Sequence, residues 1–164
     1  MNQKTSASND RALAFLRICV GTLFLIFGQY KLFGRAFTRE GGFQFWINRF
    51  LQDGAYPFMI PVLKGFVLPH ATAISFLVAF GELAIATSLL LGLWTKPASI
   101  FGFIYMMTLL FSSNYPGSHA PLWQYFGASL EHMVPTLCFA AFAITRRQDT
   151  LPLRRLWSRD RTSA

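Results

Sequence analysis

The stretch ATAISFLVAFGELAIATSLLLGLW, residues 71–94, decides the fold because it is long enough to cross a lipid bilayer as one helix. A helix rises about 1.5 Å per residue, and about 20 apolar residues span the hydrocarbon core. Glu82 is the one charged residue in this stretch and lies near its middle. An acid at that depth costs roughly 2.5–3.5 kcal/mol, so such residues usually face a bundle interior and mark a functional site.

The composition agrees with a membrane protein. Only 13% of the 164 residues are charged, against about 25% in soluble domains. The length predicts a single integral membrane domain over residues 1–164. The net charge is +8, and the basic residues cluster at the ends of apolar segments. Membrane lipids with anionic headgroups, and no nucleic acid, are therefore the expected partners.

We predict an all-α membrane protein, a four-transmembrane-helix bundle with spans at about 11–33, 70–94, 97–113 and 125–144. Pro97 should open the third span, because proline is favoured at the first helical position. Residues 95–97 would then form a tight hairpin. Ten of the 15 Lys and Arg residues, including those of a basic tail at 145–164, fall on the side of the two termini. The positive-inside rule therefore places both termini in the cytoplasm.

The first loop is expected to carry an amphipathic helix over residues 43–52. Its apolar face repeats at helical spacing and consists of Phe43, Trp46, Ile47, Phe50 and Leu51. Such a helix lies in the membrane interface. The following stretch, 57–69, is apolar but too short and too interrupted by proline to cross. It is either a plain interfacial loop, or a gate or docking surface over the mouth of the bundle.

Polar side chains inside the predicted spans fall at similar depth, by the helical rise of about 1.5 Å per residue. These side chains are Gln29, Lys31, Glu82, Glu131 and His132. Arg17 lies nearer the cytoplasmic end and can extend toward an acid. Pro135 should leave the Glu131 carbonyl without its helical hydrogen bond. Glu131 and His132 are adjacent, about 100° apart around the helix, so both cannot point straight inward.

Two interpretations of these residues remain open. Glu82 is either one half of a buried ion pair with Lys31 or Arg17 that fixes helix register, or a proton-accepting or headgroup-binding carboxylate. His132 is either a plain buried imidazole, or a proton carrier or hydrogen-bond donor to a quinone. Gly21 and Gly28, seven residues apart, should allow close helix approach.

Metal and thiol chemistry have little support in the sequence. There is no metal-ligand cluster of the usual spacing, and no haem signature, which argues against haem. Cys19 and Cys138 lack C-x-x-C spacing.

Four short motifs resemble the DoxX/DoxD family of small integral membrane proteins: RICVG at 17–21, FGQYKLFG at 27–34, GELA at 81–84 and LGLWTKPA at 91–98. The resemblance implies a four-helix bundle in the bacterial inner membrane. Some members are the small subunit of a thiosulfate:quinone oxidoreductase, and others join membrane oxidoreductase complexes. Arg17 and Glu82 match family positions.

The first functional hypothesis is a subunit of an inner-membrane oxidoreductase that handles a quinone or protons near Glu82. Its expected catalytic residues are Glu82, Glu131 and His132, and its expected substrate-binding residues are Arg17, Gln29 and Lys31. The sequence has no flavin motif, cluster ligands or redox thiol pair, so an electron-carrying subunit or larger membrane complex is the implied partner. One alternative is a structural or assembly subunit without chemistry of its own. Another is a small proton-coupled carrier.

Overall fold

The computed structural model describes residues 3–145, and every regular element in this range is helical. The helices are α1 (Gln3–Phe33), α2 (Arg35–Thr38), α3 (Gly42–Asp53), α4 (Ile60–Val62), α5 (Ala71–Leu91), α6 (Thr95–Ser112), α7 (Leu122–Gly127) and α8 (Leu130–Ile144), with a π-helical turn (Leu63–Val67) continuing α4. The all-α prediction is confirmed over this range. The predicted basic tail, beyond its first residue, lies outside the described residues.

Two of the described helices are long and apolar enough to cross a membrane: residues 11–33 of α1, and α5. They coincide with the first two predicted spans. α8 is apolar but shorter. The prediction of one continuous helix over 125–144 was wrong, because α7 ends at Gly127 and α8 begins at Leu130. The break lies at Ser129, whose hydroxyl accepts a hydrogen bond from Asn114 Nδ2 at 2.9 Å.

The turn between α5 and α6 also differs from the prediction. α5 ends at Gly92, which adopts a left-handed conformation (φ 69°) and donates its N–H to the Ser88 carbonyl. Helix α6 then begins at Thr95, so Pro97 is the third residue of the helix and not the first. Proline is tolerated there because the first-turn N–H groups have no helical partner. The hairpin is therefore 92–94.

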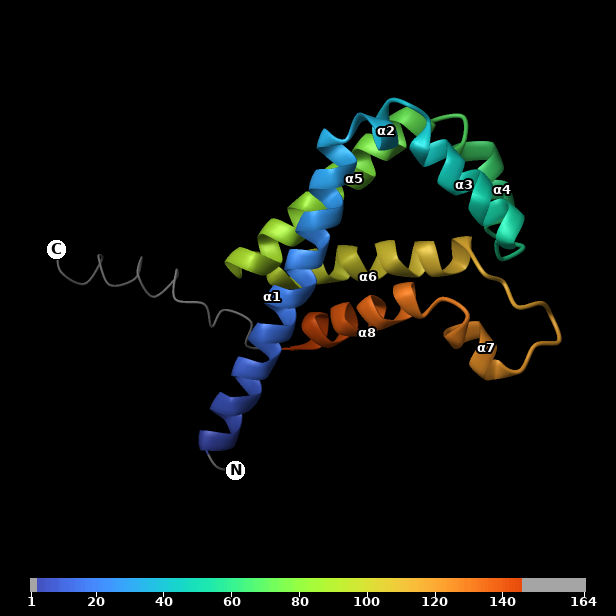
Figure 1. Ribbon diagram of the computed structural model, residues 1–164. Coiled ribbons are helices and arrows are strands. Elements are labelled where there is room, and N and C mark those ends of the chain that lie inside the picture. The colour runs from blue at the N-terminus through green and yellow to red at the C-terminus, as the bar shows by residue number, and fades with distance from the viewer. Residues whose placement is uncertain (1–2, 146–164) are drawn as a thin grey trace.

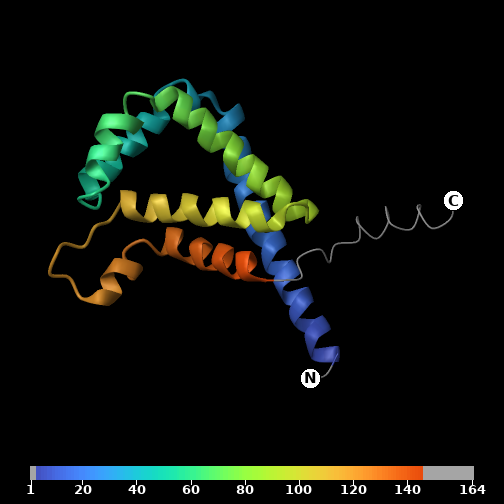
Figure 2. The ribbon, with the colours of Figure 1, turned by 180° about the vertical axis from the view of Figure 1, so that it is seen from behind.

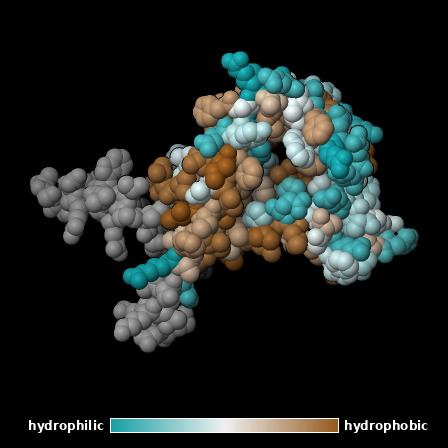
Figure 3. Space-filling model, viewed as in Figure 1, coloured by the Kyte–Doolittle hydropathy of each residue, from teal (hydrophilic) through white to brown (hydrophobic). Residues whose placement is uncertain are grey.

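The long helices form two pairs, α1 with α5 and α6 with α8, which make the most extensive contacts between elements. Figures 1 and 2 show that the pairs come together where α1 passes the beginning of α6 and the end of α8. The pairs diverge toward the end that carries α2, α3, α4 and α7. We call this end the loop end. Figure 3 shows hydrophobic surface over the long helices and hydrophilic surface gathered at the loop end.

Glycines allow the two helices of each pair to pack closely together. A Cβ on Gly21 or Gly28 would come within 3.1 Å of leucine side chains of α5. This confirms that these two glycines permit close approach of α1. Gly102 does the same for the other pair, because its Cβ would lie 2.4 Å from the Phe139 ring of α8. Both interfaces therefore depend on the absence of a side chain.

The loop end has a small core of its own. α3 spans Gly42–Asp53, which confirms a helix over the predicted 43–52, and it buries Phe43 and Ile47. The chain after α3 is held against the end of α6, since Tyr56 N–H donates to the Phe111 carbonyl at 3.1 Å and Tyr115 N–H donates to the Gly54 carbonyl at 2.7 Å. These contacts close the loop end around the diverging helix pairs.

Candidate functional site

Glu82 lies in the middle of α5 and is 4% exposed, so its carboxylate is shielded by the neighbouring helices. The close contact at Gly28 brings α1 against this part of α5, with Leu83 as the contact residue. Lys31 follows Gly28 by three residues and therefore lies on the same face of α1. Its ammonium forms a salt bridge and a hydrogen bond with Glu82 Oε1.

Tyr105 of α6 supplies a second donor to the same carboxylate. Its hydroxyl donates to Glu82 Oε1 at 2.6 Å, and its ring packs edge-on against Phe24. The other carboxylate oxygen, Oε2, is buried and has no hydrogen-bond partner among the described residues. An ionised carboxylate accepts through both oxygens. Oε2 of Glu82 can therefore accept a further hydrogen bond, while Lys31 balances the charge of the carboxylate.

A pocket of about 320 Å³ opens between the two helix pairs beside this contact. Its charged and titratable side chains are Lys31, Glu82, Glu131 and His132. The remaining wall is apolar and is formed by Val20, Leu23, Phe24, Phe27, Met106, Leu109 and Pro135. The structure thus gathers four predicted site residues from α1, α5 and α8 around one hollow.

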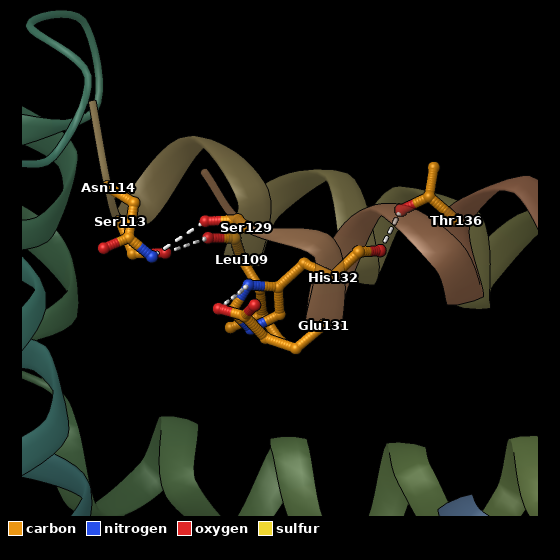
Figure 4. Close-up of polar contacts among 7 residues, drawn as sticks. All are labelled: Leu109, Ser113, Asn114, Ser129, Glu131, His132 and Thr136. Carbon is orange, nitrogen blue, oxygen red and sulfur yellow. Dashed lines mark hydrogen bonds and ion pairs between the residues drawn. The ribbon is translucent and has the colours of Figure 1, made fainter. Parts of the chain in front are cut away.

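Glu131 and His132 are the second and third residues of α8, and Figure 4 shows the carboxylate and the imidazole side by side, joined by a dashed contact. The imidazole is 15% exposed, whereas the Glu131 side chain is 62% exposed. The imidazole nitrogen Nδ1 of His132 and the carboxylate oxygen Oε1 of Glu131 lie 3.6 Å apart. His132 is therefore the inward-facing member of the pair. Glu131 stands at the rim of the pocket.

The two other predicted site residues lie apart from this pocket. Gln29 is exposed and is not among the residues that line the pocket. It precedes Lys31 by two positions, about 200° around the helix, so it faces nearly the opposite way. Arg17 is buried, at 3% exposed, four turns before Lys31 on α1. It is also absent from the pocket wall.

Tyr105 is the residue that sequence reasoning missed. The available signal was a phenol far from either end of an apolar segment, where a buried hydroxyl needs a partner. Over residues 3–145, no group of three or more His, Cys, Asp and Glu side chains is close enough to hold a metal ion. The candidate site thus consists of the Lys31–Glu82 ion pair with the phenol of Tyr105, and the imidazole of His132 lines the same pocket as the ion pair.

The DoxX family model matches residues 12–114, which is more than half of the chain. The chain belongs to the DoxX family. The matched region contains Lys31, Glu82 and Tyr105, and it ends before α7 and α8. No curated protein and no solved structure matches the chain. Glu131 and His132 therefore lie outside the matched region of this DoxX-family protein.

Proposed function

We propose that this DoxX-family protein is an integral membrane subunit of a bacterial inner-membrane oxidoreductase complex, and that it exchanges protons with a quinone at Glu82. One observation carries the proposal. A buried carboxylate contacts an ammonium and a phenol at the wall of a pocket that also holds an imidazole. Positioned groups of these types perform general acid–base catalysis. A quinone also partitions into the apolar surroundings that this pocket offers.

The reaction would need contributions from more than one chain. Reduction of a quinone to a quinol consumes two electrons and two protons. The sequence has no flavin motif, cluster-ligand pattern or redox thiol pair, so the electrons would come from a partner subunit. The protons would pass through Glu82. It accepts hydrogen bonds from Lys31 and Tyr105, and both donors carry dissociable protons. His132 would resupply them from the loop end.

The arrangement of the helices supports the membrane topology that this role requires. We propose that α1, α5, α6 and α8 all cross the bilayer, with α3 lying in the interface. The beginning of α1 and the end of α8 lie on the same side of the molecule, opposite the loop end (Figure 1). Both termini would then be cytoplasmic. α6 has 18 residues, about 27 Å of helix, and bilayers thin locally around short spans at modest cost.

The test is quinone-dependent turnover by the complex purified from membranes that carry Glu82→Gln. Glutamine keeps the size of the side chain but cannot accept the proton, so turnover should fall at least about 100-fold, the usual contribution of a general acid–base group. Thr22→Val is the matched control, since Thr22 is an exposed polar residue of α1 that bonds the carbonyl of Ile18. Full turnover by the Glu82→Gln complex would refute the proton role.

A structural or assembly subunit is the second candidate. The observation that favours it is a set of large exposed aromatic side chains along α1, among them Phe15 at 70%, Phe27 at 57% and Phe33 at 78%. Such surface can pack on a neighbouring membrane helix. In that case Phe15→Ala would release the partner in mild detergent, and Glu82→Gln would leave turnover of the assembled complex unchanged.

A further inference from the structure

A second hollow also has Glu82 in its wall. It is a groove of about 560 Å³ between α5 and α6, and its lining is almost wholly apolar. Leu77 and Phe101, two of its lining residues, are 71% and 67% exposed, so the groove opens on the outer surface of the helices. That surface faces acyl chains if α5 and α6 cross the membrane. We call it the α5–α6 groove.

Two of the polar side chains in the wall of the α5–α6 groove, Glu82 and Tyr105, form the buried carboxylate contact. The other two, Ser88 and Trp94, lie nearer the α5–α6 turn. Residues 77–88 of α5 follow the groove, a length of about 16 Å by helical rise. The volume lies within the range of small-molecule sites, about 300–1,000 Å³. A long, apolar molecule with one polar group matches this distribution.

The hydrogen bonds that Glu82 already makes indicate which headgroup the ligand should carry. Glu82 Oε1 already accepts from Lys31 and Tyr105, while the buried Oε2 accepts from nothing among residues 3–145. A buried acceptor without a donor is costly, about 1–3 kcal/mol, so a ligand gains most by donating to it. A carbonyl head cannot donate. An anionic head would repel the carboxylate, whose one basic contact is already made.

We infer that the α5–α6 groove binds an uncharged long-chain amphiphile whose hydroxyl headgroup donates a hydrogen bond to Glu82 Oε2. An isoprenoid quinol and a diacylglycerol share this chemistry. The inference rests on the proposed function in that a quinol would be the reduced product of the reaction proposed at Glu82. It adds that the groove discriminates in favour of the hydroxyl form, and that the ligand enters laterally from lipid.

Gly81 offers a direct way to block the groove. It lines the groove, and a Cβ at this position would have no atom within 4 Å. The Cβ of Gly81→Phe therefore starts in open space at the groove wall, where the ring can occupy part of the groove, and replacing glycine in a helix interior does not lower helix stability. Gly65 is the matched control, because its Cβ would also meet open space and it lies in the π-helical turn at the loop end.

The experiment uses the full chain in nanodiscs with diazirine-tailed probes: an isoprenoid quinol, its dimethyl ether, a diacylglycerol and its hydroxyl-methylated ether. We expect crosslinks on α5 and α6. The hydroxyl form of each pair should bind about tenfold more tightly than its ether, equivalent to about 1.4 kcal/mol. Gly81→Phe should lower labelling at least about tenfold, while Gly65→Phe should leave it unchanged. The stronger of the two hydroxyl probes identifies the source of the ligand.

The double variant Lys31→Met/Glu82→Gln tests the headgroup contact while removing both charges together. It should bind each hydroxyl probe and its ether equally, because an amide both donates and accepts. Equal binding of hydroxyl and ether probes by the unmodified protein would overturn the inference, as would undiminished labelling of Gly81→Phe. Either failure leaves the turnover test of Glu82→Gln unaffected. Loss of that proton role would conversely leave groove binding intact.

Discussion

Lys31 and Glu82 form an ion pair across the contact between α1 and α5, although 51 positions separate them in the sequence. The two helices can approach closely because Gly28 faces Leu83, one turn before Lys31. The ion pair is thus a consequence of helix packing. It compensates a charge that would otherwise be costly at this depth.

Removing one member of this pair should destabilise the protein more than removing both. Lys31→Met leaves Glu82 buried without its counter-charge, a change that typically costs about 3–5 kcal/mol. The double variant Lys31→Met/Glu82→Gln should recover most of that loss. Thermal unfolding in detergent, followed by circular dichroism, measures both. Additive losses in the double variant would show that the two side chains act independently.

Tyr105→Phe should destabilise the protein by about 1.5–3 kcal/mol, because it deletes a hydrogen bond to a charged acceptor in a buried place. Tyr30→Phe is the control, since Tyr30 is 66% exposed on α1 and surface changes stay within about 0.5 kcal/mol. Chemical unfolding of the two variants in the same detergent gives the comparison. Equal midpoints would mean that the Tyr105 hydroxyl contributes nothing to stability.

Gly28→Ala should separate α1 from α5 and loosen the ion pair. The added Cβ would lie 3.0 Å from the Leu83 side chain and 3.1 Å from its backbone nitrogen. Overpacking of this kind costs about 1–3 kcal/mol. Gly81→Ala, on the open side of α5, should instead be neutral or stabilising by up to about 1 kcal/mol. Melting temperatures of the two alanine variants should therefore move in opposite directions.

Alkaline pH should weaken the loop end through Tyr56. Burial, together with the neighbouring Tyr125 and Tyr115, raises the pKa of Tyr56 above its ordinary value. The folded state then holds its proton longer than the unfolded state, so its contribution to stability is complete below about pH 10 and is lost as pH rises further. Stability measured from pH 8 to 11 should fall less in Tyr56→Phe than in the unmodified protein.

A cysteine at position 119 should decide between two and four spans. His119 is exposed in the connection between α6 and α7. With four spans it faces the periplasm, whereas with only α1 and α5 crossing it faces the cytoplasm. A membrane-impermeant maleimide applied to spheroplasts of His119→Cys, in a background without Cys19 and Cys138, should label the four-span protein. Labelling only after lysis would contradict the four-span topology.

Several features were predictable because they are properties of one helix. The length and apolar character of α1 and α5 follow from their residues, and so does the amphipathic character of α3. Close helix packing at Gly21 and Gly28 could also be predicted from the sequence, since small residues on one face indicate close packing. The ends of the helices were harder to predict from the sequence. The break at Ser129 depends on Asn114 reaching it across fifteen residues.

The sequence indicated which polar residues belong to apolar segments, but not which way their side chains point. Gln29, Lys31, Glu82 and His132 were correctly recognised as polar groups in otherwise apolar segments. Rotation about the helix axis then turned Gln29 outward and brought Lys31 onto Glu82. The position of Tyr105 within an apolar segment indicated that its hydroxyl needs a partner, but the identity of that partner depends on how α6 packs against α5.

The sequence by itself determined that this chain forms apolar helices and that a carboxylate must lie within one of them, because hydropathy and helical rise act locally. Tertiary structure alone decided which partners that carboxylate meets and that two hollows share it in their walls. The reason is physical. Partner choice depends on the rotation and separation of whole helices, which glycine contacts distant in sequence set together.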